Sequence, residues 1–217
     1  MYKLSHFTEK NEELVFEFMQ KNSFAFVTSM LDGFPVATHI PLEIKKQNDH
    51  LVLTGHIMKE TDHYKAFVQN ENVLVIFTGP HCYVSAGWYV AKNVASTWNY
   101  MDVHAKGKIK LTDNEGTKKI IKDLTDRYES LESEAAFHKL PVEYVNRLST
   151  AIVGFHIEVD SLENVFKLSQ NKDEVTKKQI IENLRKTNRY FENEIAGEMV
   201  LRQAQYDNTL AGLVDMK

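Results

Sequence analysis

Hydrophobic and polar residues alternate with a period of two along much of the first half of the chain, which predicts β-strands. Segments 24–31 and 34–44 follow this pattern on either side of Asp32-Gly33, a dipeptide typical of tight hairpin turns. A further alternating segment, 50–57, follows a polar turn. The first third of the chain is therefore expected to form a β-meander.

The strand pattern returns later in the chain. An apolar run at 73–77 has the length of a buried strand and leads into Gly79-Pro80, which predicts a turn. Segments 98–111 and 151–159 also alternate as strands. Several antiparallel strands joined by tight turns favour a small barrel or a sandwich over repeated βαβ units.

Apolar residues at helical spacing mark most of the remaining chain. Helices are predicted at 8–22, 61–69, 115–131, 141–148 and 173–199. We therefore expect an α+β fold with peripheral helices. Residues 1–171 would form the main domain, and 172–217 a helical C-terminal extension packed on it or on a dimer partner. The last residues, 206–217, are expected to be loosely ordered or bound to another subunit.

Charge and cysteine content narrow the class of protein. The 217 residues include 26 Lys and Arg against 30 Asp and Glu, a formal net charge of -4, so a strong non-specific affinity for nucleic acid is not expected. The single cysteine cannot form a disulfide within the chain, which suits a reducing cytoplasm. No run of 18 apolar residues occurs, so we expect a cytoplasmic protein without membrane contact.

Several well-known site motifs do not occur. The sequence contains neither GxGxxG nor GxxxxGK followed by Ser or Thr, which argues against Rossmann and P-loop nucleotide sites. It also has no CxxC, HExxH or GxSxG segment, so neither a zinc site nor a nucleophile elbow is expected.

The most unusual stretch, residues 77–107, mixes aromatic rings with hydrogen-bonding side chains. It holds both tryptophans, Trp88 and Trp98, together with Ser85, Thr97 and Asn99. Core or dimer-interface packing is the commoner fate of such rings. A flat polar ligand such as an isoalloxazine ring would use both kinds of group.

A second candidate lies between the strand at 50–57 and the helix that follows it. Lys59 comes just before this helix, where a cation and free backbone N–H groups could meet a phosphate. The alternative is that Lys59 is a surface residue and Gly55 relieves a crowded bend. His39, two residues before Pro41, is either a ligand contact or a hydrogen-bonded sheet histidine.

Six blocks of the sequence resemble, in order, the signature segments of PaiB-type FMN-binding proteins, also described as FMN-binding negative transcriptional regulators. They span residues 39–171. The blocks are His39-Ile40-Pro41-Leu42, Gly55-His56, Phe77-Thr78-Gly79-Pro80, Tyr83-Val84-Ser85 with Trp88-Tyr89, Thr97-Trp98-Asn99-Tyr100 with Val103-His104 and Gly107, and Lys167-Leu168-Ser169-Gln170-Asn171.

This resemblance implies an antiparallel split β-barrel, a homodimer, and FMN bound at the subunit interface. It implies that Lys59 contacts the phosphate of FMN, and that Thr54, Gly55 and His56 line the ribityl or phosphate end of the cofactor. It also implies groups around the ring or the dimer rim, and a C-terminal segment that closes the site. The implied FMN contacts are His39, Thr54, Gly55, His56 and Lys59; Ser85, Trp88, Thr97, Trp98 and Asn99; and Lys167, Ser169, Gln170 and Asn171.

The chain also departs from the family pattern. Ala86 and Ser96 replace prolines, and Thr61-Asp62 and Asn164-Val165 replace Asn-Pro and Gly-Lys pairs. Lys59 replaces an arginine and so lacks the bidentate fork that binds phosphate, which predicts weaker FMN binding or another phosphate contact.

Three functions remain open at this stage. The first is an FMN-binding protein, in which the flavin would supply the chemistry of an oxidoreductase. The second is a non-enzymatic transcriptional regulator that binds DNA or a partner, which the family name implies and the net charge supports little. The third is a haem-binding split barrel, with His39, His56 or His104 as axial ligand.

Overall fold

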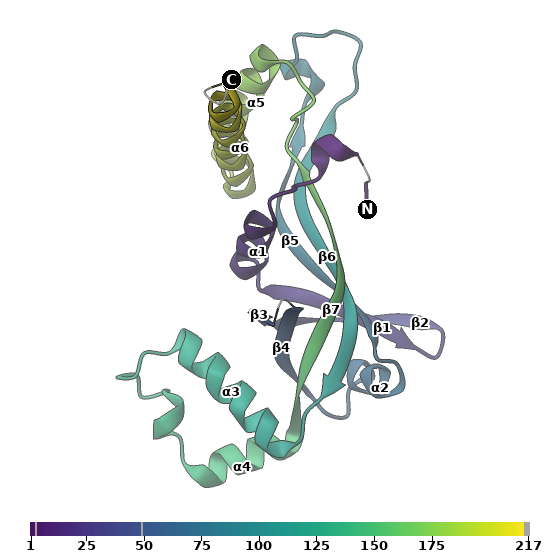
Figure 1. Ribbon diagram of the computed structural model, residues 1–217, viewed down its shortest axis with the longest axis vertical. Coiled ribbons are helices and arrows are strands. Elements are labelled where there is room, and N and C mark those ends of the chain that lie inside the picture. Colours follow the sequence, from purple (N-terminus) through teal and green to yellow (C-terminus); the bar gives the residue numbers. More distant parts are fainter. Residues whose placement is uncertain (3, 49, 215–217) are drawn as a thin grey trace. The chain divides into compact units, whose positions relative to one another are not determined.

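The computed structural model of the chain describes residues 1–2, 4–48 and 50–214, and side chains up to residue 204. Within these residues the fold is mixed α+β, with seven strands and six α-helices (Figure 1). The strands are β1 (Phe24–Leu31), β2 (Phe34–Pro41), β3 (Glu43–Gln47), β4 (His50–Met58), β5 (Asn72–Val84), β6 (Thr97–Leu111) and β7 (Ile152–Lys167).

The strands form one sheet in the order β2-β1-β5-β6-β7-β4-β3. The pairs β1–β2, β1–β5, β3–β4 and β4–β7 are antiparallel. Strands β2 and β3 end this order, so the sheet is open in the part of the chain that the structure describes. The predicted antiparallel strands are thus confirmed, and their closure into a barrel is not seen.

The helices are α1 (Glu12–Lys21), α2 (Asp62–Gln69), α3 (Asn114–Tyr128), α4 (Val142–Ala151), α5 (Glu174–Lys186) and α6 (Tyr190–Val214). Polar side chains cap several of them, Asn11 at the start of α1 among them, which satisfies N–H groups that the helix itself leaves free. Thr61 accepts from the N–H of Tyr64 at the start of α2, and Asp113 and Asp173 do the same for α3 and α5.

Two of the strands differ from the sequence-based expectations. Gly79-Pro80 lies inside β5 and forms no turn. The register of β1 on β5 covers only residues 74–76, so Pro80 lies beyond it and its missing N–H breaks no bond of that ladder. The segment 34–44 is two strands, β2 and β3, with a break at Leu42, whose N–H bonds to the carbonyl of Ser23 instead.

The C-terminal helix is divided and long. The predicted helix 173–199 is two helices, α5 and α6, separated around Asn188, which has a positive φ of 52°. α6 continues to Val214, so residues 206–214 are helical and not loosely ordered; binding of this segment to another subunit stays a prediction, and residues 215–217 lie outside the description.

The chain forms two compact units, each built from separated segments. We call residues 16–77 and 103–163 the hairpin unit, and residues 1–15, 78–102 and 164–217 the tail unit. Strands β5, β6 and β7 contribute residues to both units. The predicted division between residues 171 and 172 stays a prediction.

The core of the hairpin unit follows from strand alternation. On β1, Ala25 and Val27 are buried whereas Phe24, Phe26 and Met30 are exposed. Helix α2 packs against β1 and β2 (Figure 1). The most deeply buried side chains of this core include Val27, Leu42, Leu53, Val75, Phe77, Phe155 and Ile157.

The core of the tail unit lies where α5 and α6 pack against each other. Ile180 and Leu184 of α5 and Ile195 of α6 are fully buried, and Met199 of α6 is nearly so. The helical pattern of the C-terminal segment therefore reflects a real apolar face. Among the described residues, no helix combines the length and apolar character needed to cross a membrane.

Candidate functional site

The hairpin unit contains an open pocket of about 300 Å³ between the ends of β2 and β4 and the start of α2. Three histidines line it, His39, His56 and His63, together with the capping residue Thr61. His39 and His56 were both predicted as cofactor contacts, and the structure brings them to one pocket. No group of three metal-ligating side chains occurs among the described residues.

His56 has a free hydrogen-bonding atom inside the protein. Its Nδ1 is buried and has no hydrogen-bond partner among the described residues. Burial also lowers the pKa of the imidazole, so His56 is neutral at pH 7. An unpaired buried polar atom destabilises the fold by about 1–3 kcal/mol unless a ligand or water pairs with it.

His39 lies on the exposed face of the β1–β2 hairpin. It is directly opposite Phe26, with ring centroids 3.7 Å apart, and it stacks on Phe24 at 5.0 Å and 17°. These contacts fix the imidazole ring and leave it accessible. His39 is therefore a surface residue held by aromatic contacts, and no side-chain hydrogen bond of its ring occurs among the described residues.

Lys59 is tied to the protein. Its Nζ donates to the backbone carbonyl of Thr150 at 3.1 Å, and its N–H donates to the carbonyl of Ala151 at 2.9 Å. It is not among the residues that line the pocket of His39 and His56. Thr54 donates to Glu43 at 3.5 Å, and an added Cβ at Gly55 would lie 2.9 Å from the ring of Phe155. Tight packing thus explains this glycine without a ligand.

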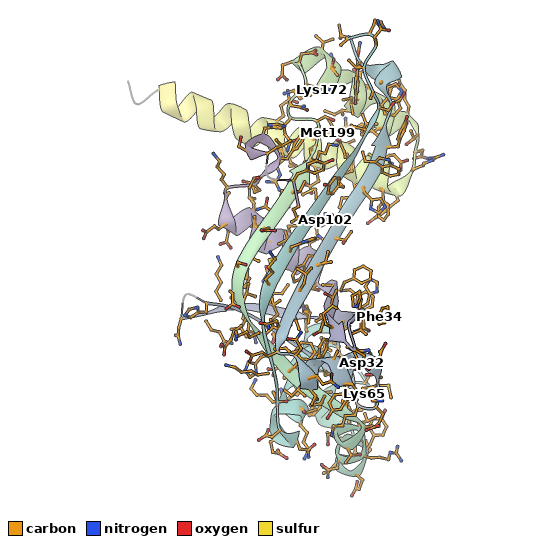
Figure 2. The ribbon with its side chains drawn as sticks, turned by 90° about the vertical axis from the view of Figure 1, so that its right-hand side faces the viewer. Asp32, Phe34, Lys65, Asp102, Lys172 and Met199 are labelled. Carbon is orange, nitrogen blue, oxygen red and sulfur yellow. The ribbon has the colours of Figure 1, made fainter. Side chains whose placement is uncertain are left out.

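The tail unit joins two of the predicted blocks that lie far apart in the sequence. Lys167, the last residue of β7, donates to the hydroxyl of Thr97 on β6 at 2.5 Å. The hydroxyl of Ser169 donates to the carbonyl oxygen of Asn99 at 3.0 Å. The amide of the fully buried Asn99 also contacts the sulfur of Met199 on α6 at 3.7 Å. Lys172, labelled in Figure 2, follows this segment.

The turn after β7 is held by its own side chains. Ser169 has a positive φ of 60°, a conformation that costs energy for a residue other than glycine. Gln170 accepts from the N–H of Leu168 at 2.7 Å and donates to the carbonyl of Phe166. Ser169 and Gln170 therefore use polar atoms inside the fold, whereas Asn171 is exposed.

Lys167 is a partly buried cation. Its Nζ lies 5.7 Å from the ring centroid of Tyr2 and 5.8 Å from that of Phe7. Burial and repulsion from Lys172 both lower the pKa of its ammonium group. Lys172 in turn lies 4.6 Å above the ring of Tyr89, whose buried hydroxyl has no partner among the described residues.

The aromatic stretch divides between core and surface. Tyr89 is 3% exposed, whereas Trp98 is 53% exposed and lies beside Tyr83 and His81, with ring centroids 6.1 and 6.3 Å away. Ser85 caps the short 3-10 helix Ala86–Trp88 by accepting from Gly87 at 3.1 Å. Trp98 is thus not a core residue of the tail unit.

Three potential functional residues were not predicted: Lys172, Tyr89 as a polar group, and Asp102. One carboxylate oxygen of Asp102 is buried and has no hydrogen-bond partner within the described residues. Burial raises the pKa of this carboxyl, whereas a hydrogen bond from Thr78 and the charge of His81 lower it. An acid within an otherwise aromatic strand was a visible signal. Lys172 directly follows the last signature block, but only the fold brings it near Lys167 and Tyr89.

The sequence was compared with known protein families and with known proteins. A family model described as "Putative FMN-binding domain" matches residues 1–161. The protease synthase and sporulation protein PAI 2 of Bacillus subtilis (strain 168) is 36% identical over 185 residues, which are 85% of this chain and 89% of that protein.

Two solved structures have a similar fold. The FAD and heme binding protein from Mycobacterium smegmatis matches with a TM-score of 0.57 at 16% identity, over 74% of this chain and 73% of that one. The flavocytochrome Anf3 from Azotobacter vinelandii matches with a TM-score of 0.54 at 14% identity, over 77% and 72%. At these identities the likeness concerns the fold alone.

Proposed function

This chain belongs to the PaiB-type family of FMN-binding domains, and from that premise we propose which of its residues bind FMN and in what assembly. The observation that carries the assignment is the pairing of Thr97 with Lys167 and of Asn99 with Ser169. It joins the two most distinctive signature blocks into one polar cluster. That cluster supplies a cation and hydroxyls, which an anionic, hydrogen-bonding cofactor requires.

The unpaired groups of the chain fit a flavin. FMN has an anionic phosphate, a hydroxylated chain and a flat ring with polar edges. In the tail unit, Lys167 offers positive charge, and Tyr89 has a buried hydroxyl without a partner among the described residues. We propose these two as contacts, together with the predicted residue Trp98 of the same unit, whose ring is accessible. Bound flavin would supply redox chemistry, and the protein would bind and orient it.

We further propose that the chain is a homodimer whose two subunits complete a split β-barrel. The supporting observation is the exposed apolar face of β1, where Phe24, Phe26 and Met30 are 66%, 36% and 44% exposed. Phe34, labelled in Figure 2 beside the hairpin turn, is 76% exposed but pairs with Leu31, so it lies on the other face of the hairpin. An exposed apolar face such as that of β1 is typical of a surface that a second copy covers.

The test is binding of FMN to the purified protein. We expect quenching of FMN fluorescence and a higher melting temperature, because a ligand at 100 times its Kd stabilises the folded state by about 2.7 kcal/mol. Bleaching of the bound flavin's visible absorbance by NADH or NADPH would then support an oxidoreductase. If micromolar FMN neither binds nor raises the melting temperature, the proposal is wrong.

Haem binding is a second candidate, because His56 presents a neutral imidazole with an unpartnered nitrogen at the hairpin-unit pocket. A neutral imidazole nitrogen is the form that binds haem iron. Haem binding predicts a Soret band on addition of haem that is lost in His56→Ala and kept in His104→Ala. A band that survives His56→Ala would exclude this histidine as the ligand.

Direct DNA binding as a transcriptional regulator receives little support from the described helices. On α3, Lys118, Lys119 and Lys122 each lie beside an acid, Glu115, Asp123 and Asp126 respectively. These pairs neutralise the positive charge that a phosphate backbone would need. A salt-sensitive mobility shift of duplex DNA on addition of the protein would support direct DNA binding.

A further inference from the structure

We propose that Lys167 and Lys172 of the tail unit form an anion subsite for a phosphate monoester, and that this subsite, not Lys59, holds the phosphate of FMN. The identity of the ligand rests on the proposed function, whereas the presence of an anion subsite rests on the two lysines and their surroundings.

The first argument is uncompensated charge. Lys172, whose N–H donates to the carbonyl of Ser169, lies in the turn that follows Lys167, and burial and then repulsion from Lys172 lower the pKa of the Lys167 ammonium group. In the described part of the chain, no carboxylate lies within ion-pair distance of either lysine. By contrast, Lys110 lies 2.8 Å from Glu158 and Lys118 lies 2.8 Å from Glu115. A bound anion would counter this repulsion and favour the charged form of Lys167.

The second argument is the supply of free hydrogen-bond donors. A lysine ammonium has three donors, and Lys167 uses one for the hydroxyl of Thr97. The ring below Lys172 belongs to Tyr89, which is 3% exposed and has a buried hydroxyl without a partner in the described part of the chain. A phosphate group, with three strong acceptor oxygens, would satisfy such donors.

The third argument is preorganisation. Lys167 and Lys172 lie on either side of the turn in which Ser169 adopts a positive φ. That conformation is stabilised by the bond from Ser169 to Asn99 and by the two bonds of Gln170. The N–H of Lys172 also donates to the carbonyl of Ser169 at 3.0 Å. Ser169 is thus a positioning residue: it orders the turn that carries the cations.

Lys59 fits this role less well. Its Nζ already donates to the carbonyl of Thr150, and its backbone N–H to that of Ala151, so both groups expected to meet a phosphate are used within the hairpin unit. His56, which precedes Lys59 by three residues and lines the hairpin-unit pocket, has a lowered pKa and adds no positive charge at pH 7. The sequence-based expectation of phosphate at Lys59 therefore competes with hydrogen bonds that the fold already makes.

The experiment compares FMN with riboflavin, which lacks the phosphate, by fluorescence titration of the wild type and three variants. In Lys167→Gln and Lys172→Gln we expect FMN to bind about 10- to 100-fold more weakly, the loss typical of a charge-assisted hydrogen bond, with riboflavin affinity unchanged. The matched control, Lys59→Gln, should bind both flavins as the wild type does. Circular dichroism verifies that each variant is folded.

Each other outcome decides against one of the two proposals. Equal loss of FMN and riboflavin in Lys167→Gln would show that this residue does not recognise phosphate. A selective loss of FMN in Lys59→Gln alone would place the phosphate in the hairpin unit. If the wild type binds neither flavin, the FMN proposal fails, and inorganic phosphate tests the subsite by itself. Stabilisation by phosphate that Lys167→Gln abolishes supports the subsite, and no stabilisation refutes it.

Discussion

The hydroxyl of Ser169 and the carbonyl oxygen of Asn99, 70 residues apart in the chain, are joined by a hydrogen bond of 3.0 Å. Asn99 is fully buried, and Ser169 is 2% exposed. A buried amide that loses such a partner keeps its desolvation cost. This one bond therefore couples the stability of the tail unit to the turn that carries Lys167 and Lys172.

Removal of this hydroxyl should destabilise the protein. We expect Ser169→Ala to lower the free energy of unfolding by about 1–3 kcal/mol, because Asn99 is left unpaired and the positive φ remains. Ser169→Gly should cost less, because glycine adopts this φ without strain. Urea unfolding of both variants measures the difference, with the exposed Asn171→Ala as a control expected within about 0.5 kcal/mol of wild type. Equal stability of Ser169→Ala and wild type would contradict this role.

Asp102 should make stability depend on pH. Burial raises its folded-state pKa above the usual 3.8, so the unfolded chain releases this proton first as pH rises. Stability is then lost with rising pH between the unfolded and the folded pKa. Asp102→Asn removes this loss, so its melting temperature should exceed that of wild type increasingly as pH rises above the unfolded pKa, about 4.

The control for this pH effect is Asp160→Asn, which changes an exposed acid of β7. Its melting temperature should follow the wild-type pH profile. A difference between Asp102→Asn and wild type that is constant across the pH range would mean that ionisation of Asp102 is not the cause.

Substitution by alanine should have opposite effects on stability at two of the glycines. An alanine Cβ at Gly55 would lie 2.9 Å from Phe155 and 3.0 Å from Leu42 in the hairpin core. Gly55→Ala should therefore destabilise by about 1–3 kcal/mol through overpacking. At Gly197 of α6, no described atom outside the adjoining turns of its own helix lies within 4 Å of the added Cβ, so Gly197→Ala should stabilise by about 0.5–1 kcal/mol. Chemical unfolding checks both signs.

A substitution that disrupts the proposed homodimer should lower the molecular mass of the protein in solution. A charge at the exposed Phe24, in Phe24→Glu, should prevent a second copy from covering the face of β1 and shift the protein toward the monomer in sedimentation experiments. Val68 of α2 is similarly exposed, at 60% against 66%, so Val68→Glu is the matched control and should leave the mass unchanged. A wild type that is monomeric at all concentrations would rule out the dimer.

Local sequence was sufficient for much of the secondary structure. Asp32-Gly33 does form the β1–β2 turn, with φ of 51° and 81°, because this dipeptide adopts positive φ more readily than most. Likewise, the hydroxyl of Thr61 and the carboxylate of Asp173 cap helices that begin where the spacing of apolar residues predicts. These interactions link residues a few positions apart, so they are visible in a short stretch of sequence.

The tertiary structure decided which of these residues share an environment. Gly79-Pro80 has the composition of a turn but is part of β5, because Pro80 lies beyond the register of β1 on β5. The burial of Asp102 and the approach of Lys172 to Lys167 depend on β6, β7 and the turn that follows β7. The sequence alone did not decide whether the aromatic rings of residues 77–107 pack in the core or at a dimer interface, or contact a ligand. The fold buries Tyr89, exposes Trp98 and joins Asn99 to Ser169, because burial and electrostatic repulsion depend on distance in space and not along the chain.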